Sequence, residues 1–494
     1  MKDKKSIFSS ESTTVTTGSG GTRLSRRVMK VMGMFAGLQS FNIICSIVKM
    51  KLVSIWLQSA GVALFGILAT AQETIATFTD LGLRQSTVRD VAAEAENNSR
   101  LSRIAMLVRR WSVLAGLLGA TVILALSPVL GEWFFDDFAG CIPFALMSVS
   151  MFFNCLLYGE QSLLQGTGML RSLAKGSLQG TMVGLIVSIP MFRWLGMESV
   201  PLSFIVYSIA IWGFTFRARY RSKEKVMAPG LRQLWNEGKG FVRLGILMSM
   251  ATFLTSMSRL IFVGVLTRVA SLDTTGLYQA GDTLVSRYIG LIFTAIGMEF
   301  FPRLVSCVKS RRRTSVYVNH EIILLLTVVT PVALVFILCR EIVVDVLFSK
   351  EFLPILTFIS LAVTGTILKS MSWCMAICII ARGNGRLYLL VEGIDALLSL
   401  GLLIGGYLLW GLDGLGWAYI AWNLLYVVIV WIACKSRYGI VPSSKVVLAL
   451  GVSVMLCGLA CCAMQWFPVW LAACCILPFA ISYFVPLRRL MAKR

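Results

Sequence analysis

The sequence is poor in charged residues and has almost no histidine. Only 14% of its 494 residues are charged, whereas soluble domains carry about 25%. His320 is the single histidine, and the thirteen cysteines lack paired metal-ligand spacing with it. A chain that is 57% hydrophobic, with a mean hydropathy of +0.79, cannot bury that much apolar surface in one water-soluble domain. This composition indicates an integral membrane protein.

Apolar segments long enough to cross a bilayer recur along the chain. Each is about 20 residues long and must be helical in lipid, where every backbone N–H and C=O group needs an internal partner. We therefore predict an all-α polytopic membrane protein with about 14 transmembrane helices. They are expected at 28–50, 58–82, 106–127, 139–160, 173–193, 199–217, 241–266, 275–301, 321–340, 353–381, 386–410, 413–434, 446–465 and 467–487.

Lysine and arginine are distributed very unevenly among the predicted loops. If the N-terminus is cytoplasmic, the inside segments hold 37 of the 46 basic residues. The predicted external loops carry acids instead, at 132–137 and 345–351. Basic residues mark cytoplasmic loops, so both termini are expected inside. The basic clusters behind the net charge of +22 then lie beside the membrane ends, where anionic lipid attracts them. Binding to nucleic acid is not needed to explain this charge.

Three landmarks recur in the two halves at offsets of about 213 to 217 residues. Gly61–Phe65 corresponds to Gly276–Tyr278, Leu81-Gly82 to Ile296-Gly297, and the Gly-rich turn at 165–168 to the one at 382–385. The repeats predict two six-helix lobes related by an axis along the membrane normal, followed by two further helices. The predicted division is a disordered N-terminus 1–27, an N-lobe 28–217, a cytoplasmic linker 218–240, a C-lobe 241–434 and a C-terminal part 435–494 with the last two helices and a basic end. Glycines spaced four residues apart, at 33/37, 176/180/184 and 401/405, are expected to let neighbouring helices approach closely.

Ionisable residues inside the apolar spans are the main candidates for a functional site. A lipid-facing charge at the bilayer centre costs at least about 2.5 kcal/mol, so such residues normally face a cavity or pair with each other. Each of them therefore has two interpretations, a structural salt bridge or a role in transport. The acidic candidates for ion coupling are Glu73, Asp282, Glu299, Glu392 and Asp395.

Basic residues predominate in the middle of the predicted second lobe. Arg259, Arg287 and Lys369 lie within spans, and Lys51 and Arg268 lie at predicted outer helix ends. Because arginine and lysine both bind phosphate, a cavity with these side chains would attract an anionic headgroup. We predict that these five residues line a cationic cavity and bind such a headgroup while the lipid tail remains in the bilayer.

Several sequence motifs resemble the Wzx-type polysaccharide flippases of the multidrug/oligosaccharidyl-lipid/polysaccharide exporter superfamily. They are the segments 51–57, 59–66 and 80–83 in the first half, and 276–281 and Glu299–Leu304 in the second. Taken in order, they resemble that family over about residues 28–434. Gln58 and Ser59 stand where the family commonly has a Gly-Pro-like turn, and Phe301 stands where it usually has tyrosine before Pro302.

The resemblance implies a flippase in the bacterial inner membrane with a V-shaped pair of lobes. Its expected substrate is an undecaprenyl-pyrophosphate-linked oligosaccharide of the O-antigen, capsule or exopolysaccharide type. Transport would proceed outward by alternating access, with H⁺ or Na⁺ as the coupling ion. The resemblance also implies a polysaccharide polymerase and a chain-length regulator as partners. Only Lys51 and Arg303 match its motif positions, and Arg303 has an alternative interpretation as an orientation anchor at a helix end.

Other functions stay open at this point. A drug/cation antiporter of the same superfamily would be expected to have twelve helices and fewer embedded cations. A flippase for the peptidoglycan precursor lipid shares the fourteen-helix plan. A membrane enzyme such as a polymerase or ligase usually needs a long catalytic loop, and no predicted external loop exceeds about 15 residues. The sequence therefore predicts a transporter without a catalytic site, cofactor or metal.

Overall fold

The computed structural model describes residues 37, 41–79, 87–88, 91, 98–219 and 231–466, and these residues form helices and short connections with no strand. The predicted disordered N-terminus, the beginning of the first helix, Gly33 of the 33/37 pair and the helix at 467–487 lie outside the described residues. The same holds for Asp80–Leu83 and for residues 220–230 of the predicted linker.

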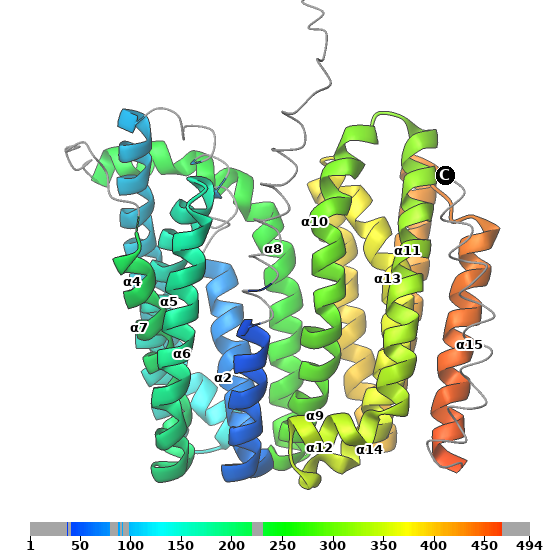
Figure 1. Ribbon diagram of the computed structural model, residues 1–494, viewed down its shortest axis with the longest axis horizontal. Coiled ribbons are helices and arrows are strands. Elements are labelled where there is room, and N and C mark those ends of the chain that lie inside the picture. The colour runs from blue at the N-terminus through cyan, green and yellow to red at the C-terminus, as the bar shows by residue number, and fades with distance from the viewer. Residues whose placement is uncertain are drawn as a thin grey trace, which may run out of the picture.

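The first half contains a helix over 41–56, followed by α2 (Gln58–Thr79), α4 (Asn98–Phe135), α5 (Cys141–Gly166), α6 (Leu170–Trp194) and α7 (Ser199–Arg217). The second half contains α8 (Leu231–Val269), α9 (Leu272–Asp282), a π-helical segment (Thr283–Ile289), α10 (Gly290–Cys307), α11 (Arg311–Leu338), α12 (Arg340–Leu347), α13 (Leu356–Ala381), α14 (Gly385–Tyr438) and α15 (Ser444–Trp466). In Figure 1, α4 to α7 gather on one side and α10 to α15 on the other, with α2, α8 and α9 between them. We call 41–56 and α2 to α7 the N-lobe, and α8 to α14 the C-lobe.

Within the described residues, ten helices are long and apolar enough to span a membrane. One of them, α14, covers two predicted spans and is interrupted at Trp410 and Gly411, where Gly411 has a φ of +62°. The all-helical membrane fold is thus confirmed, whereas the number fourteen stays a prediction.

Several boundaries differ from the predicted ones. Helix α4 runs from Asn98 to Phe135, well beyond the predicted 106–127, because the helix continues through Pro128 and begins within a polar, basic segment. Helix α8 begins at Leu231, inside the predicted linker. The short helix α12 was not predicted, since its eight residues mix charged and apolar side chains. After α12, Lys350–Ile355 form a 3₁₀ turn, so α13 starts at Leu356.

The glycine spacings have two different outcomes. A Cβ atom on Gly176 or Gly180 would lie 2.9 or 2.4 Å from the α7 backbone, and one on Gly184 would lie 2.7 Å from the ring of Tyr207. The predicted close approach of α6 and α7 is therefore confirmed. The corresponding prediction for Gly401 and Gly405 stays a prediction: a Cβ atom on either glycine would have no neighbour within 4 Å among the described residues, which do not include the helix expected at 467–487. These two glycines line an open apolar groove on α14.

The lobes meet where α2 packs against α9. A Cβ atom on Gly276 would lie 2.0 Å from the carbonyl oxygen of Ser59, so only glycine permits this approach. Gln58, directly before Ser59, has a φ of +57°, a conformation that favours glycine, and it separates the first helix from α2. The two landmarks that match between the sequence halves, near Gly61 and Gly276, thus belong to the two helices that touch across the lobe interface.

Polar contacts tie the lobes together at the same end. The Ser59 hydroxyl lies 2.5 Å from a carboxylate oxygen of Asp273 and 2.8 Å from one of Glu351. We call the contacts made by Ser59, together with those of Lys51 and Arg268 described below, the latch. Basic residues 303–313 lie at the other end of α10, so the latch is at the opposite end of the helices from that basic loop.

Candidate functional site

A cavity of about 390 Å³ lies where α2 meets α8, α9, α13 and α14. This volume falls within the range of about 300–1,000 Å³ that is typical of ligand pockets. Five of the predicted charged residues line it: Glu73, Arg259, Asp282, Lys369 and Glu392. The embedded charges therefore converge on one polar cavity, as expected if the bilayer excludes them from lipid-facing positions.

Arg259 and Asp282 form one wall of the cavity. The Arg259 guanidinium is ion-paired with the Asp282 carboxylate, which also accepts a hydrogen bond of 2.7 Å from the Ser286 hydroxyl. Ser286 belongs to the π-helical segment that follows α9, and such segments are frequent at functional sites. The Asp282 side chain is only 9% exposed, so its charge is compensated by Arg259. This pair has the geometry of a structural salt bridge on the cavity wall.

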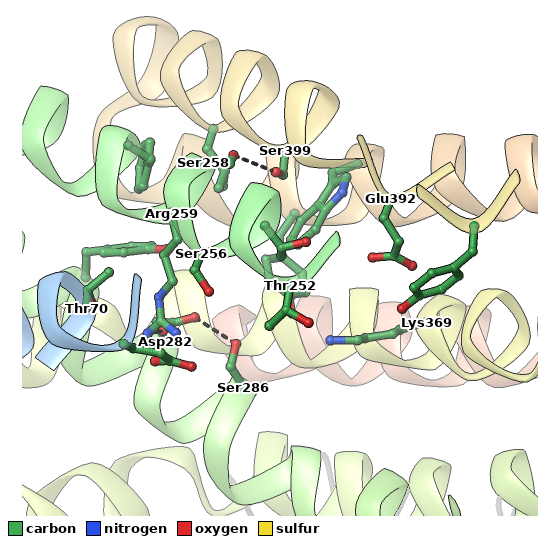
Figure 2. A pocket seen from close by; sticks show the side chains of 18 residues that line it. Thr70, Thr252, Ser256, Ser258, Arg259, Asp282, Ser286, Lys369, Glu392 and Ser399 are labelled. Atoms are coloured by element: carbon green, nitrogen blue, oxygen red, sulfur yellow. Dashed lines mark hydrogen bonds and ion pairs between the residues drawn. The ribbon is translucent and has the colours of Figure 1, made fainter. Parts of the chain in front are cut away.

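Lys369 lies on the opposite side of the cavity. Figure 2 shows its ammonium group extending into the pocket, with Glu392 beside it and with Arg259 and Asp282 farther along the cavity. Among the described residues, no carboxylate oxygen forms an ion pair with Lys369 within 4.0 Å, in contrast to Arg259. The Lys369 ammonium group therefore faces the cavity without a direct ion pair, and the Glu392 carboxylate lies beside it.

The acidic side of the cavity is held by aromatic residues of α14. The Tyr426 hydroxyl donates a hydrogen bond of 2.8 Å to Glu392, and the Trp422 indole N–H donates one of 2.7 Å to Asp395. Asp395 is buried behind Trp422, which itself lines the cavity. Both donors come from the second part of α14, beyond the break at Gly411. The hairpin made by this break thus brings hydrogen-bond donors to two carboxylates of its first part.

The cavity is less cationic than predicted. Arg259 and Lys369 are its only basic lining residues within the described part of the chain, and three carboxylates line it with them. Lys51, Arg268 and Arg287 do not line it. The prediction that five cations line the cavity is therefore wrong: Lys51 and Arg268 contact carbonyl groups at helix ends, and Arg287 is exposed on the π-helical segment.

Lys51 and Arg268 belong to the latch. The Lys51 ammonium donates to the carbonyl oxygen of Phe348 and, at 2.5 Å, to that of Asp345, at the C-terminal end of α12. Arg268 donates to the backbone oxygens of Glu132 and Trp133, and its guanidinium lies 3.1 Å from the Asp136 carboxylate. Both side chains satisfy carbonyl groups at helix C-termini, where positive charge is favoured. Their observed role is to hold the lobes together.

The remaining predicted residues do not line the cavity. Arg287 is exposed on the π-helical segment. Glu299 and Arg303 form an exposed ion pair one helical turn apart on α10, and Arg303 also faces a basic hollow together with Arg312, Arg313 and His320. The positions of Glu299 and Arg303 fit an anchor at the membrane end better than an ion-coupling site in the membrane interior.

Sequence reasoning missed the uncharged part of the cavity. Thr252, Thr255, Ser256 and Arg259 follow one face of α8 at helical spacing and all line the cavity. This spacing of hydroxyl groups within an apolar helix was a usable signal. Lys49 was not among the predicted site residues either. Its ammonium group lies 4.4 Å from the ring centre of Phe65 and 4.6 Å from that of Tyr207, so aromatic rings surround it inside the N-lobe. The aromatic donors Tyr426 and Trp422 carried no sequence signal, because only the α14 break brings them to the acids.

No group of three or more histidine, cysteine, aspartate or glutamate side chains that could hold a metal ion occurs in the part of the chain that is described. The groups that line the cavity are the Lys369 ammonium group, the Arg259–Asp282 salt bridge, the carboxylates of Glu73 and Glu392 and several hydroxyl groups. Such a set can hold an anion and can exchange a proton or a monovalent cation at a carboxylate.

Comparisons with known proteins agree with this fold. A family model described as "Polysaccharide biosynthesis protein" matches residues 61–357, more than half of the chain. The structure of "Lipid II flippase MurJ, inward closed conformation" superposes with a TM-score of 0.70 at 13% identity, over 93% of this chain and 98% of that one. An inward-facing multidrug resistance MATE family transporter gives 0.64 at 12% identity, over 81% and 97%, and an outward-facing one gives 0.58 at 13% identity, over 83% and 96%. A comparison with curated protein sequences gives no significant match.

Proposed function

The chain belongs to the polysaccharide biosynthesis protein family, and from this premise we propose that it is a flippase for undecaprenyl-pyrophosphate-linked oligosaccharide. The fold is that of the membrane flippases and exporters of its superfamily. The cavity adds a place for the headgroup: Lys369, which forms no ion pair within the described part of the chain, extends its ammonium group into this polar space. This single observation supports an anionic cargo most directly.

The proposed direction of transport follows from the distribution of charge. If the basic loops are cytoplasmic, as their lysine and arginine content predicts, the latch lies at the periplasmic end. The structure then corresponds to a state closed toward the periplasm, because Ser59, Lys51 and Arg268 all bridge the lobes there. The lipid-linked oligosaccharide would enter from the cytoplasmic leaflet, and opening of the latch would release it on the other side.

Coupling to a cation is proposed from the acids beside Lys369. Glu392 and Asp395 lie one turn apart on α14, and Glu73 and Asp282 carry two further carboxylates at the same cavity. With all its carboxylates ionised, the lining would repel a pyrophosphate. Binding of H⁺ or Na⁺ at Glu392 and Asp395 would remove this repulsion, so cation binding and substrate binding would influence each other.

The test is the amount and the sidedness of lipid-linked oligosaccharide in cells depleted of the protein. We expect complete repeat units to accumulate in the cytoplasmic leaflet while surface polysaccharide is lost. Absent or truncated units would indicate a membrane enzyme such as a polymerase or ligase. Unchanged amounts and sidedness of the lipid-linked oligosaccharide would contradict the flippase function and favour a drug/cation antiporter. Accumulation of the peptidoglycan precursor lipid alone would favour a flippase for that lipid.

A further inference from the structure

A second cavity, of about 430 Å³, adjoins the first one on the N-lobe side. It lies between α2, α5 and α7 and shares the lining residues Glu73 and Thr252 with the cavity that contains Lys369. We call it the N-lobe compartment. The two spaces together extend from the C-lobe cations across the lobe interface into the N-lobe.

The two spaces differ in charge. The lining of the N-lobe compartment has no basic residue within the described part of the chain, and Glu73 is its only acid. Its polar lining consists instead of amides and hydroxyl groups, contributed by Gln72, Asn154, Tyr158 and two threonines. A pyrophosphate would find no counter-charge here, whereas an uncharged polar group would lose little of its hydrogen bonding on entry.

The two amides are held in place by a shared hydroxyl group. Gln72 Nε2 and Asn154 Nδ2 donate to Ser150 Oγ at 3.1 and 3.4 Å, and Ser150 in turn donates to the Phe204 carbonyl oxygen at 3.3 Å. Each of these bonds uses one of the two N–H groups of its amide. Each amide therefore retains one N–H donor and a carbonyl acceptor that no described residue occupies.

A fixed donor and acceptor on one group match the hydroxyl groups of a sugar, which both donate and accept. The compartment also offers aromatic side chains: Tyr158 and Phe204 line it, and Phe204 is stacked on Phe65 with 4.6 Å between ring centres. Rings of this kind give apolar contact beside polar groups. Few but fixed polar groups in a partly apolar pocket are the usual means of orienting an uncharged ligand.

We propose that the N-lobe compartment is the sugar subsite, in which Gln72 and Asn154 bind hydroxyl groups of the oligosaccharide while its pyrophosphate lies near Lys369. This inference rests on the proposed flippase function and assigns two parts of the substrate to two different sides of the joined cavities. The C-lobe side recognises the part common to all such lipids. The N-lobe side recognises the sugar that differs among them, so changes at these two amides alter which repeat unit is accepted.

The experiment compares the affinities of the purified full-length protein for two lipids. The probes are undecaprenyl pyrophosphate without sugar, and the lipid-linked oligosaccharide extracted from cells depleted of this protein. Gln72→Ala and Asn154→Ala are measured singly and together, beside Lys369→Gln. Asn42→Ala is the matched control, because Asn42 is an N-lobe amide that accepts a bond from Thr181 and lines neither cavity.

We expect each amide variant to lower the affinity for the sugar-bearing lipid by about threefold, and the double variant by about tenfold, since each loses a neutral hydrogen bond. Binding of the lipid without sugar is expected to be unchanged in these variants and weakened in Lys369→Gln. The subsite would be refuted if the amide variants bound both lipids like the wild type, or lost both equally. If the wild type bound neither lipid, the flippase function itself would fail, a result distinct from failure of the subsite alone.

Discussion

Two embedded cations line the same cavity in different electrostatic surroundings. Arg259 is ion-paired with Asp282 across α8 and α9, and Ser286 completes that arrangement. Lys369 has no such partner among the described residues, and the nearby Glu392 is bonded by Tyr426 instead. Removing one partner of a buried ion pair destabilises a protein, whereas a cation without a direct partner can face a cavity and contact a ligand there. Structural and functional charges can therefore be separated here by their partners rather than by their depth in the bilayer.

Reversing the charge of Lys369 is the strongest test of the difference between the two cations. In Lys369→Glu the cavity gains a fourth carboxylate and loses its free ammonium group, so we expect transport to fall by about 100-fold or more, as for the loss of a charged hydrogen bond. The amount of protein inserted in the membrane is expected to stay the same, because no salt bridge is broken. Surface polysaccharide and protein abundance are measured together. Normal export in this variant would contradict the role of Lys369.

Substitutions at the Arg259–Asp282 ion pair should mainly affect the stability of the protein. Removing only one partner, in Asp282→Asn or Arg259→Met, leaves a buried charge unpaired, which costs about 3 kcal/mol or more in soluble proteins. We expect a lower melting temperature and lower abundance. The double variant Arg259→Met/Asp282→Leu should recover much of this stability, because it buries no charge. Equal stability of all three variants and the wild type would show that the pair is not structural.

These assignments show what the sequence could reveal. Charges in the middle of apolar spans converge on the cavity because lipid excludes them, so Arg259, Asp282, Lys369 and Glu392 were predictable as a group. Lys51 and Arg268 were not separable from that group, since their partners are backbone carbonyl groups at the ends of distant helices. The partners of Glu392 and Asp395 depend on the break at Gly411, and the direction of Arg287 depends on the π-helical segment. The break itself was predicted, since separate helices were expected at 386–410 and 413–434, but the side-chain contacts that it creates and the π-helical segment have no local sequence signal.

In the proposed transport cycle, the cavity that contains Lys369 is closed at the end where the latch lies. Gly276 cannot accept a Cβ atom without moving away from Ser59, so Gly276→Ala should separate α2 from α9 at the latch. We expect a cysteine introduced at Ser256, in the cavity, to react several-fold faster with a membrane-impermeant thiol reagent added from the periplasm. The same cysteine in a protein that retains Gly276 serves as the control. Equal labelling rates in the two proteins would show that this contact does not close the cavity.

The smallest expected effect concerns the acid beside Lys369. In Glu392→Gln one negative charge is removed from the cavity, so we expect undecaprenyl pyrophosphate to bind about threefold more tightly, a modest electrostatic effect at a high effective dielectric constant. Transport by this variant should no longer respond to an imposed H⁺ or Na⁺ gradient. Weaker binding with an unchanged response to both gradients would indicate that Glu392 contacts the substrate rather than a coupling ion.

The most direct test of the flippase function uses the purified protein in lipid vesicles loaded with the lipid-linked oligosaccharide. The measured quantity is the fraction of oligosaccharide that an impermeant sugar-modifying enzyme can reach from outside as a function of time. We predict that wild-type protein makes nearly all of it accessible within minutes, while vesicles with Lys369→Glu retain the inner half in protected form, like vesicles without protein. Protection of the inner half in the presence of the wild-type protein would contradict the proposed flippase.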